Sequence, residues 1–418
     1  MQTDLAPEFK DTRDGQAAEA ILRKCVHCGF CNATCPTYQL LGDELDGPRG
    51  RIYLMKQVLE GAPVTRSTQL HLDRCLTCRN CETTCPSGVE YGHLVDIGRK
   101  IVDERVERPF QEKSLRWLLK EGLTSPLFGP AMKMGQLVRP LLPAALKNKV
   151  PAPGGKRAHQ WPMRTHKRKV LMLLGCVQPS MMPNINSATA RVLDAAGIQT
   201  LVADGAGCCG AIRTHLNDAE GGMTDARRNI DAWWPLVEGL TSEGKVEAIV
   251  MNASGCGVAV KDYGHALAHD PDYAQKARRV SDLTRDLSEL LPDLAVALKT
   301  KLKHSGKKAS PMKLAFHPPC TLQHGQQLRG GVEVHLNALG FDVSVATNES
   351  HLCCGSAGTY SVLQPKLAYA LRDRKLENLL PLQPQAIVSA NIGCIQHLQS
   401  GTTTPVKHWV EVLDEALS

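Results

Sequence analysis

The chain has 418 residues, of which 43% are apolar, so it is long enough for about three domains and can bury a substantial core. Residues 1–10 include Asp4 and Glu8 and no apolar run, and no stretch reaches the ~20 apolar residues that span a bilayer, so we expect neither a secretory signal nor a transmembrane segment. The net charge is +7, and sixteen cysteines fall at metal-ligand spacings, which disfavours disulfides and favours a reducing cytoplasm.

Eight of the cysteines stand in two runs of the same spacing. Each run has three cysteines at intervals of three residues, a fourth cysteine four residues later, and then a proline: Cys25, Cys28, Cys31, Cys35 and Pro36, followed by Cys75, Cys78, Cys81, Cys85 and Pro86. Bacterial ferredoxins use this spacing to hold two 4Fe–4S clusters, and the fourth cysteine of each run ligates the other cluster. Zinc also binds C-x-x-C pairs in fours, but it leaves the fourth cysteine and the proline of both runs unexplained. We therefore assign one cluster to Cys25, Cys28, Cys31 and Cys85, and the second to Cys75, Cys78, Cys81 and Cys35.

Helices are predicted around these runs. Pro48 suits the first turn of a helix and Gly61 its end, and apolar residues recur at helical spacing between them. The same spacing continues from Val89 through Val102 to about residue 107. We therefore expect residues 1–108 to form a ferredoxin-like domain with helical flanks and two clusters packed close together.

Residues 109–168 are predicted to form a basic linker. Between Lys113 and Lys169, thirteen lysines and arginines face a single acidic residue, Glu121. Apolar residues such as Trp117 and Phe128 are interleaved with them, a composition that suits the surface of an anionic membrane or an acidic partner subunit. A solvated linker is the alternative. Nucleic-acid binding is disfavoured because no nucleic-acid recognition motif accompanies the basic residues.

The C-terminal half is predicted to be a duplicated α/β unit, over residues 169–310 and 311–418. Each copy has the pattern strand, helix, strand, helix, strand with short turns, which predicts parallel sheets. Ligands bind at the carboxyl edge of open α/β sheets, so thiols placed there should meet at one rim in each copy. Every cysteine of this half falls just past the end of a predicted strand: Cys176, Cys208, Cys209 and Cys256 in the first copy, and Cys320, Cys353, Cys354 and Cys394 in the second.

The occupant of these rims stays open. The Cys-Cys-Gly turn suits a third iron–sulfur cluster, a zinc ion or a redox-active thiol pair, and buried structural cysteines are the remaining interpretation. His317, His324 and His351 lie near the cysteines of the second copy and are further ligand or proton-relay candidates, although a lone histidine is more often structural. Residues 205–210 match the dinucleotide fingerprint G-x-G-x-x-G, but the second copy keeps only its Cys-Cys-Gly, so we expect no bound FAD or NAD.

Paired ferredoxin runs followed by two Cys-Cys-Gly repeats resemble the iron–sulfur subunits of flavin-linked dehydrogenases and the catalytic subunit of heterodisulfide reductase. In its local sequence the chain most resembles the family of glycolate oxidase (glycolate dehydrogenase) iron–sulfur subunits. This resemblance covers nearly the whole chain and weakens in the linker and around residues 301–308. It is carried by residues 25–31, 40–54, 72–89, 190–194, 229–235, 351–360 and 391–394.

The resemblance implies an α-helical ferredoxin domain in which the eight ferredoxin cysteines ligate two clusters. It also implies an electron-transfer subunit of an oxidoreductase complex, one that does not oxidise glycolate alone. Two FAD-linked partner subunits would oxidise glycolate to glyoxylate, and the clusters of this chain would pass the electrons to a membrane quinone. The complex would lie in the cytoplasm, peripherally at the inner membrane.

Other functions remain open at this point. The chain would also fit an iron–sulfur subunit of a lactate or glycerol-3-phosphate dehydrogenase, a non-catalytic assembly scaffold, or a heterodisulfide-reductase-like enzyme with its site at the Cys-Cys-Gly cysteines. Ala253 and Asn391 stand where the fuller motif of that reductase has a further cysteine. Each copy therefore offers four thiols instead of five, which weighs against the two-part cluster of that enzyme.

Overall fold

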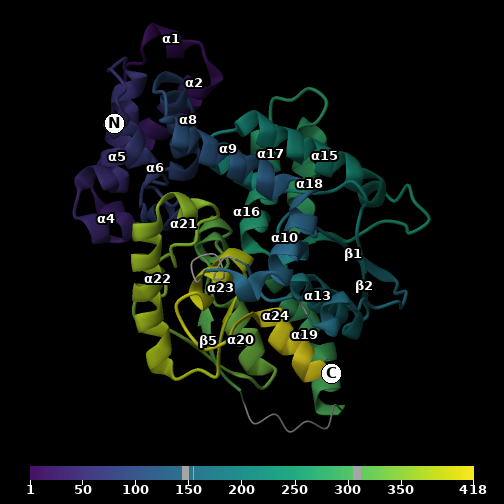
Figure 1. Cartoon of the computed structure of the whole chain (residues 1–418). Helices are drawn as coiled ribbons and strands as arrows, with labels where there is room; N and C mark the ends of the chain where they lie inside the picture. Colours follow the sequence, from purple (N-terminus) through teal and green to yellow (C-terminus); the bar gives the residue numbers. More distant parts are fainter. Residues whose placement is uncertain (144–149, 154, 305–311) are drawn as a thin grey trace.

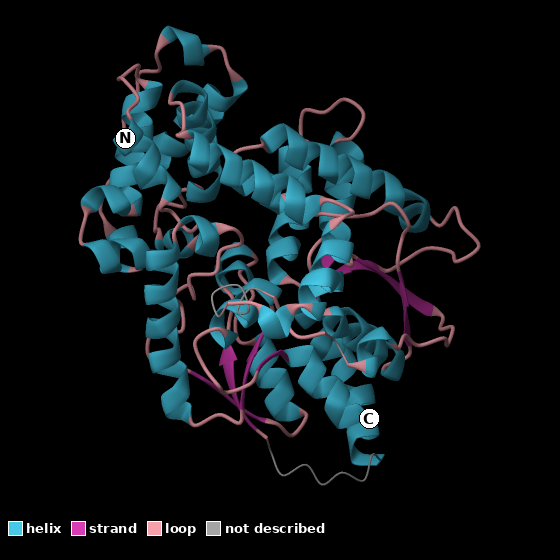
Figure 2. Cartoon of the chain, in the orientation of Figure 1, coloured by secondary structure: helices cyan, strands magenta, loops and turns pink. Residues whose placement is uncertain are grey.

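The computed structural model describes residues 1–143, 150–153, 155–304 and 312–418. A helical N-terminal region precedes two α/β units, each built on a four-stranded parallel sheet, and the parts pack against one another (Figure 1). Figure 2 shows the two sheets as separate groups of strands, each surrounded by helices. The predicted fold class is confirmed. None of the described helices combines the length and the apolar character that a membrane-spanning helix needs.

The N-terminal region is a bundle of helices around one core. Helices α5 (Pro48–Leu59) and α8 (Tyr91–Arg105) occupy the two stretches in which the sequence predicts helices, and both contribute to a core that includes Met55 and Leu94. Pro48 opens α5, as its fixed φ favours. The other elements are α1 (Pro7–Lys10), α2 (Arg13–Lys24), α3 (Phe30–Ala33), α4 (Pro36–Leu41), a 3-10 turn (Glu44–Asp46), α6 (Arg66–Asp73) and α7 (Asn80–Thr84).

The segment expected as a linker is helical over much of its length. Helices α9 (Phe110–Thr124) and α10 (Phe128–Leu137) occupy its first half, and 3-10 turns follow at Arg139–Leu141 and Lys156–His159. Helix α9 connects the other parts, because Arg116 pairs with Asp73 of the N-terminal region at 3.0 Å. Arg213 of the first α/β unit pairs with Glu121 on the same helix at 2.9 Å.

Part of the basic charge of this segment is neutralised. Arg168 and Lys169 belong to the first strand, and they pair with Glu247 and Glu243, each at 2.8 Å. Residues 144–149 of the expected linker, with Lys147 and Lys149, and the expected boundary at residues 310 and 311 lie outside the described residues.

The first α/β unit has the strand order β2-β1-β3-β4, with all neighbours parallel. Central strand β1 is buried at Val170, which pairs with Thr200 on one side and Ala248 on the other. Its elements are β1 (Arg168–Met172), α12 (Gln178–Met181), α13 (Pro183–Ala195), β2 (Ile198–Leu201), α14 (Ala211–His215), α15 (Ala219–Glu238), β3 (Ala248–Met251), α16 (Ser254–Lys261), α17 (Tyr263–Ala266), α18 (Ala274–Leu283), β4 (Thr284–Asp286) and α19 (Leu287–His304).

The second unit repeats this plan with the order β6-β5-β7-β8, again parallel. Each sheet has a fourth strand that the sequence does not predict, because β4 and β8 are too short to show a period of their own. The elements are β5 (Lys313–His317), a π turn (Thr321–Gly325), α20 (Gly331–Ala338), β6 (Asp342–Val345), α21 (Tyr360–Leu363), α22 (Pro365–Leu379), a 3-10 turn (Leu380–Leu382), β7 (Ala386–Ser389), α23 (Ile392–Gln399), β8 (Val406–His408) and α24 (Trp409–Leu417).

The two units share one hydrophobic core because they exchange their last helices. Helix α19 of the first unit packs against α20 of the second, and α24 of the second packs against α13 of the first. Arg191 on α13 pairs with Asp414 on α24 at 2.9 Å, and His408 Nε2 lies 2.9 Å from the carbonyl oxygen of Asn252. The two cysteine-bearing rims are thus parts of one packed body.

Candidate metal centres

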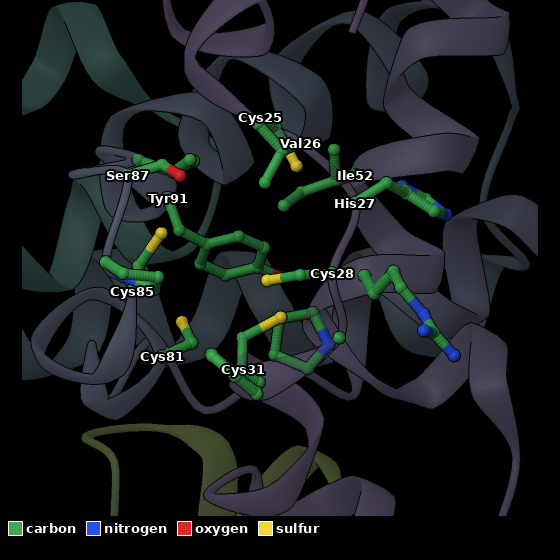
Figure 3. Close-up of a pocket in the computed structure, with 16 residues that line it drawn as sticks. Cys25, Val26, His27, Cys28, Cys31, Ile52, Cys81, Cys85, Ser87 and Tyr91 are labelled. Carbon is green, nitrogen blue, oxygen red and sulfur yellow. The ribbon is translucent and has the colours of Figure 1, made fainter.

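The first ferredoxin run surrounds a small cavity together with cysteines of the second run. Cys25, Cys28 and Cys31 of the first run line this cavity. Cys81 and Cys85 of the second run line it too, and Figure 3 shows them across the cavity from Cys28. The structure therefore brings together the four cysteines assigned to one cluster, including the crossing Cys85. All sixteen cysteines of the chain are free of disulfides.

Both ferredoxin runs curl through the same backbone conformation. In each run the residues before and after the second cysteine adopt a positive φ: His27 (58°) and Gly29 (87°) in the first, Thr77 (53°) and Arg79 (59°) in the second. Positive φ bends the chain sharply and is uncommon for residues other than glycine. Its recurrence at matching positions gives the two loops one shape.

A second set of cysteines lies beside two arginines. Its members lie close enough to affect one another's pKa: Cys35, Cys75, Cys78 and Cys81. Burial would raise the pKa of the Cys75 thiol, but the guanidinium groups of Arg51 and Arg99 outweigh it and lower that pKa below its usual range. The backbone N–H of Thr77 also donates to Cys75 Sγ at 3.4 Å, and the Tyr91 hydroxyl does so at 3.6 Å. This site therefore favours a thiolate at Cys75.

Crowding distinguishes the thiols of both sets from ordinary core cysteines. Burial and the neighbouring Cys25 raise the pKa of Cys31 to about 11, and burial and Cys320 raise the pKa of Cys78. Thiolates this close repel one another. A bound cation offsets their negative charges and so allows them to stay deprotonated. Thiolate is also the ligand that soft iron–sulfur sites prefer. The residues present therefore fit two iron–sulfur clusters.

The structure also brings the four thiols of the first Cys-Cys-Gly copy together. Hydrogen bonds from the thiols of Cys176 and Cys209 lower the pKa of Cys208, and the same bonds raise their own pKa values. Cys256, on α16, is hydrogen-bonded to Cys209. Asn229 Nδ2 donates to the carbonyl oxygen of Cys208 at 2.7 Å and holds the turn in place.

The thiols of the second copy form a similar chain of contacts. The Sγ atoms of Cys320 and Cys353 are 3.7 Å apart, and Cys354 contacts both Cys353 and Cys394. All four are buried. Lys375 on α22 lies beside them, and burial lowers the pKa of its ammonium group although the thiolates of Cys354 and Cys353 oppose that shift.

Each Cys-Cys-Gly turn depends on its glycine. Gly210 and Gly355 have φ of 87° and 88°, a left-handed conformation that disfavours other residues. A Cβ on Gly210 would lie 2.6 Å from the carbonyl oxygen of Gly222 on α15, and one on Gly355 would clash with the carbonyl oxygen of Ala368 on α22. The glycine thus lets the following helix press against the cysteine pair in both copies.

The second ferredoxin set lies beside the second Cys-Cys-Gly set. Cys320 raises the pKa of Cys78, and Cys78 does the same to Cys353, so their thiols are neighbours. Thr83 Oγ1 lies 2.9 Å from His324 Nδ1, which joins the two parts at this point. Three cysteine sets are therefore contiguous: the first ferredoxin set, the second ferredoxin set, and the set of the second copy.

A large cavity lies between the ferredoxin region and both rims. Cys78 borders it from the ferredoxin side, Cys209 and Cys256 from the first copy, and Cys320 and Cys394 from the second. Both rims therefore face the ferredoxin region.

Two cations, Arg51 and Lys375, lie near these sites. The sequence allows Arg51 either to tune cluster charge or to be a surface or structural arginine, and in the structure it is 1% exposed and acts on the charge of Cys75. Its burial was predictable, because it stands four residues before buried Met55 on the same face of α5. Lys375 likewise stands between Leu371 and Leu379 at four-residue steps along the buried face of α22.

Comparison with known proteins identifies the family. Residues 21–89 match the model of a 4Fe-4S dicluster domain, and residues 170–261 and 314–399 match the model of a cysteine-rich domain. The glycolate oxidase iron-sulfur subunit of Escherichia coli (strain K12) is 54% identical over 418 residues, covering 100% of this chain and 99% of that protein. The chain belongs to the family of glycolate oxidase iron–sulfur subunits. The predicted resemblance and the predicted iron–sulfur chemistry are both confirmed.

More distant relatives bear on the alternative functions. The probable glycolate oxidase iron-sulfur subunit of Bacillus subtilis (strain 168) is 29% identical, covering 94% of this chain and 91% of that protein. Lactate utilization protein A of Geobacillus thermodenitrificans is 24% identical, and the match covers 98% of that protein but only 59% of this chain. The two glycolate oxidase relatives thus match nearly the whole chain, whereas the lactate-utilization relative matches little more than half of it. The chain is therefore placed in the glycolate oxidase family, as an iron–sulfur subunit of an oxidoreductase complex.

Proposed function

We propose that this chain relays electrons from the oxidation of glycolate to glyoxylate, which FAD-bearing partner subunits carry out, towards a membrane quinone. The family and the geometry of the thiols support this proposal. Two 4Fe–4S clusters would serve the relay, one held by Cys25, Cys28, Cys31 and Cys85 and the other by Cys75, Cys78, Cys81 and Cys35.

The contiguity of the cysteine sets is the observation that carries the proposal. Cys81 borders the cavity of the first set while belonging to the second, so clusters bound in both would be close neighbours. Cys78 in turn adjoins Cys320 and Cys353 of the second copy. Sites that adjoin one another in this way suit the passage of electrons.

The electron balance explains why such a subunit is needed. Glycolate oxidation releases two electrons and two protons, and a quinone takes up two of each to become a quinol. Iron–sulfur clusters, when bound, carry single electrons, so each glycolate requires two passages through this chain. Arg51, Arg99 and Tyr91 would contribute by placing positive charge and a hydrogen-bond donor at Cys75, the means by which a protein sets a cluster's potential.

The direct test mixes the anaerobically purified chain with its flavoprotein subunits. We expect glycolate to reduce the clusters, seen by low-temperature EPR, only when the flavoprotein subunits are present. Chain without flavoprotein, and flavoprotein without chain, are the controls. Clusters that stay oxidised while glycolate reduces the flavin would contradict the proposal, and reduction by lactate or glycerol 3-phosphate instead would move the chain to one of those dehydrogenases.

The helices of the basic segment offer a surface for the proposed membrane attachment. Lys113 and Lys133 are exposed there beside apolar side chains. Anionic lipid attracts such cations, and large apolar side chains insert at the interface. Between residues 110 and 141 the exposed apolar side chains are Phe110, Leu115, Trp117, Leu118, Leu127, Met134, Leu137, Val138 and Leu141.

Vesicle sedimentation tests this attachment. The double variant Trp117→Gln and Leu137→Gln should bind phosphatidylglycerol vesicles at least about tenfold more weakly, since each apolar side chain contributes on the order of 1 kcal/mol or more when removed from water. Leu240→Gln, which changes an exposed leucine of the first α/β unit, is the matched control and should bind normally. Equal binding by all three proteins would place the attachment elsewhere, for example on a partner subunit.

A further inference from the structure

His317, at the end of β5, has an unusual setting for a histidine. It is 1% exposed, and neither of its ring nitrogens has a hydrogen-bond partner among the described residues. A buried polar group left without a partner costs about 1–3 kcal/mol, and nearly all such groups in folded proteins are paired. The imidazole therefore requires a partner that the described residues do not supply.

The ring lies against two thiols of the second Cys-Cys-Gly copy. A ring nitrogen of His317 and the Sγ atoms of Cys354 and Cys394 all lie within 4.8 Å of one another, and all three residues are buried. Ligands of a tetrahedral zinc ion, at ~2.0–2.3 Å from the metal, are about 3.3–3.8 Å apart. Small side-chain movements would thus bring these three donors onto one metal ion.

The first copy shows that the fold does not itself demand a histidine here. His317 stands three residues before Cys320, and Leu173, directly after the equivalent strand β1, stands three residues before Cys176. Leu173 is 4% exposed and belongs to the same apolar core as Cys209. In the first copy an apolar side chain therefore fills this place beside the four thiols, and an imidazole fills it only in the second copy.

We propose that His317 is a nitrogen ligand of a metal ion bound together with Cys354 and Cys394, so that the two Cys-Cys-Gly copies hold chemically different centres. A set of thiolates and one imidazole suits zinc or iron. Imidazole is neutral where a thiolate is charged, so this centre carries less negative charge than four thiolates would give it. The inference goes beyond the proposed electron relay, which requires only the two ferredoxin clusters.

The test uses the full chain, purified anaerobically and labelled with 15N-histidine. Metal analysis first separates zinc from iron. Zinc is examined by X-ray absorption at its own edge, which resolves nitrogen from sulfur ligands, and iron is examined by pulsed EPR for the strong hyperfine coupling of a directly bound 15N nucleus. We expect metal beyond the about eight irons of two 4Fe–4S clusters, with one nitrogen ligand.

Variants assign that nitrogen to His317. His317→Leu installs the residue of the first copy, and it should lose the nitrogen ligand. His317→Cys keeps a donor at the same place, so it should retain the metal but show sulfur alone. His408→Gln is the matched control, because His408 is a buried histidine of the same sheet whose ring nitrogens lie 2.9 Å from the Asn252 carbonyl oxygen and 3.1 Å from the Val410 N–H donor.

Two results would overturn the proposal. Wild-type chain with about eight irons and no further metal would show that the second copy is not loaded, while leaving the electron relay intact. Additional metal surrounded by sulfur alone in the wild-type chain would exclude His317 as a ligand, and this result holds even where a variant fails to fold.

Discussion

Cys85→Ala and Cys25→Ala are expected to erase the same iron–sulfur EPR signal, although the two cysteines belong to different runs of the sequence. Both line one cavity with Cys28 and Cys31. Loss of one of four thiolates opens the cluster, so each variant should contain about four fewer irons per chain and keep only one of two signals. Glycolate-dependent reduction of an acceptor should fall to background, because the series of sites is interrupted.

The second cluster gives the reciprocal result. Cys35→Ala and Cys75→Ala should both erase the other signal and keep the one lost in Cys85→Ala. Ser87→Ala is the control, because Ser87 lines the same cavity as Cys85 but supplies no thiolate, and it should keep both signals. If Cys85→Ala instead lost the signal that Cys75→Ala loses, each run would close its own cluster and the crossed assignment would be wrong.

Features encoded within a few residues were predictable from the sequence. The spacing of the cysteine runs, the helices at Pro48–Leu59 and Tyr91–Arg105, and the cysteines past the strand ends all follow from short-range periodicity and turn chemistry. The parallel direction of the first three strands in each copy was predictable in the same way, whereas their spatial order was not predicted. These are local consequences of side-chain placement along a strand or a helix.

Features that depend on packing between distant segments were not predictable. No period in the sequence encodes the contact of Cys78 with Cys320, since these residues meet only when the ferredoxin region docks on the second unit. The sequence likewise does not predict the exchange of α19 and α24, because either helix could have covered the sheet of its own unit. The unpartnered ring of His317 also emerges only once burial is known.

Removal of the Asp46 carboxylate is expected to destabilise the ferredoxin region by about 3–5 kcal/mol, the cost of leaving a buried charge without its partner. Asp46 is fully buried and lies 3.4 Å from Arg51, 3.1 Å from His71 and 2.8 Å from Arg74. In Asp46→Ala the buried guanidinium of Arg51 would keep no carboxylate. Anaerobic thermal unfolding should show a midpoint lower by on the order of 10 °C or more.

The same network reaches the second cluster site. Arg51 Nη1 donates to Thr37 Oγ1 at 3.1 Å, and that hydroxyl lies 3.3 Å from Cys35 Sγ. Asp46→Ala should therefore also release iron at a lower temperature, with the EPR signal that Cys35→Ala erases disappearing before the other. Stability and cluster retention are coupled here because one arginine serves both.

Two comparison variants separate charge from shape in this prediction. Asp46→Asn keeps an acceptor of the same size while removing the charge, so its midpoint should fall between those of the wild-type chain and Asp46→Ala. Glu19→Ala removes the partly exposed partner of Arg23, a surface pair that contributes less than about 1 kcal/mol, and this variant should unfold almost as the wild-type chain does. If Asp46→Ala unfolded within a degree or two of Glu19→Ala, the buried ion pairs would contribute no more than a surface pair, and Arg51 would have to be stabilised by the thiolates of the cluster instead.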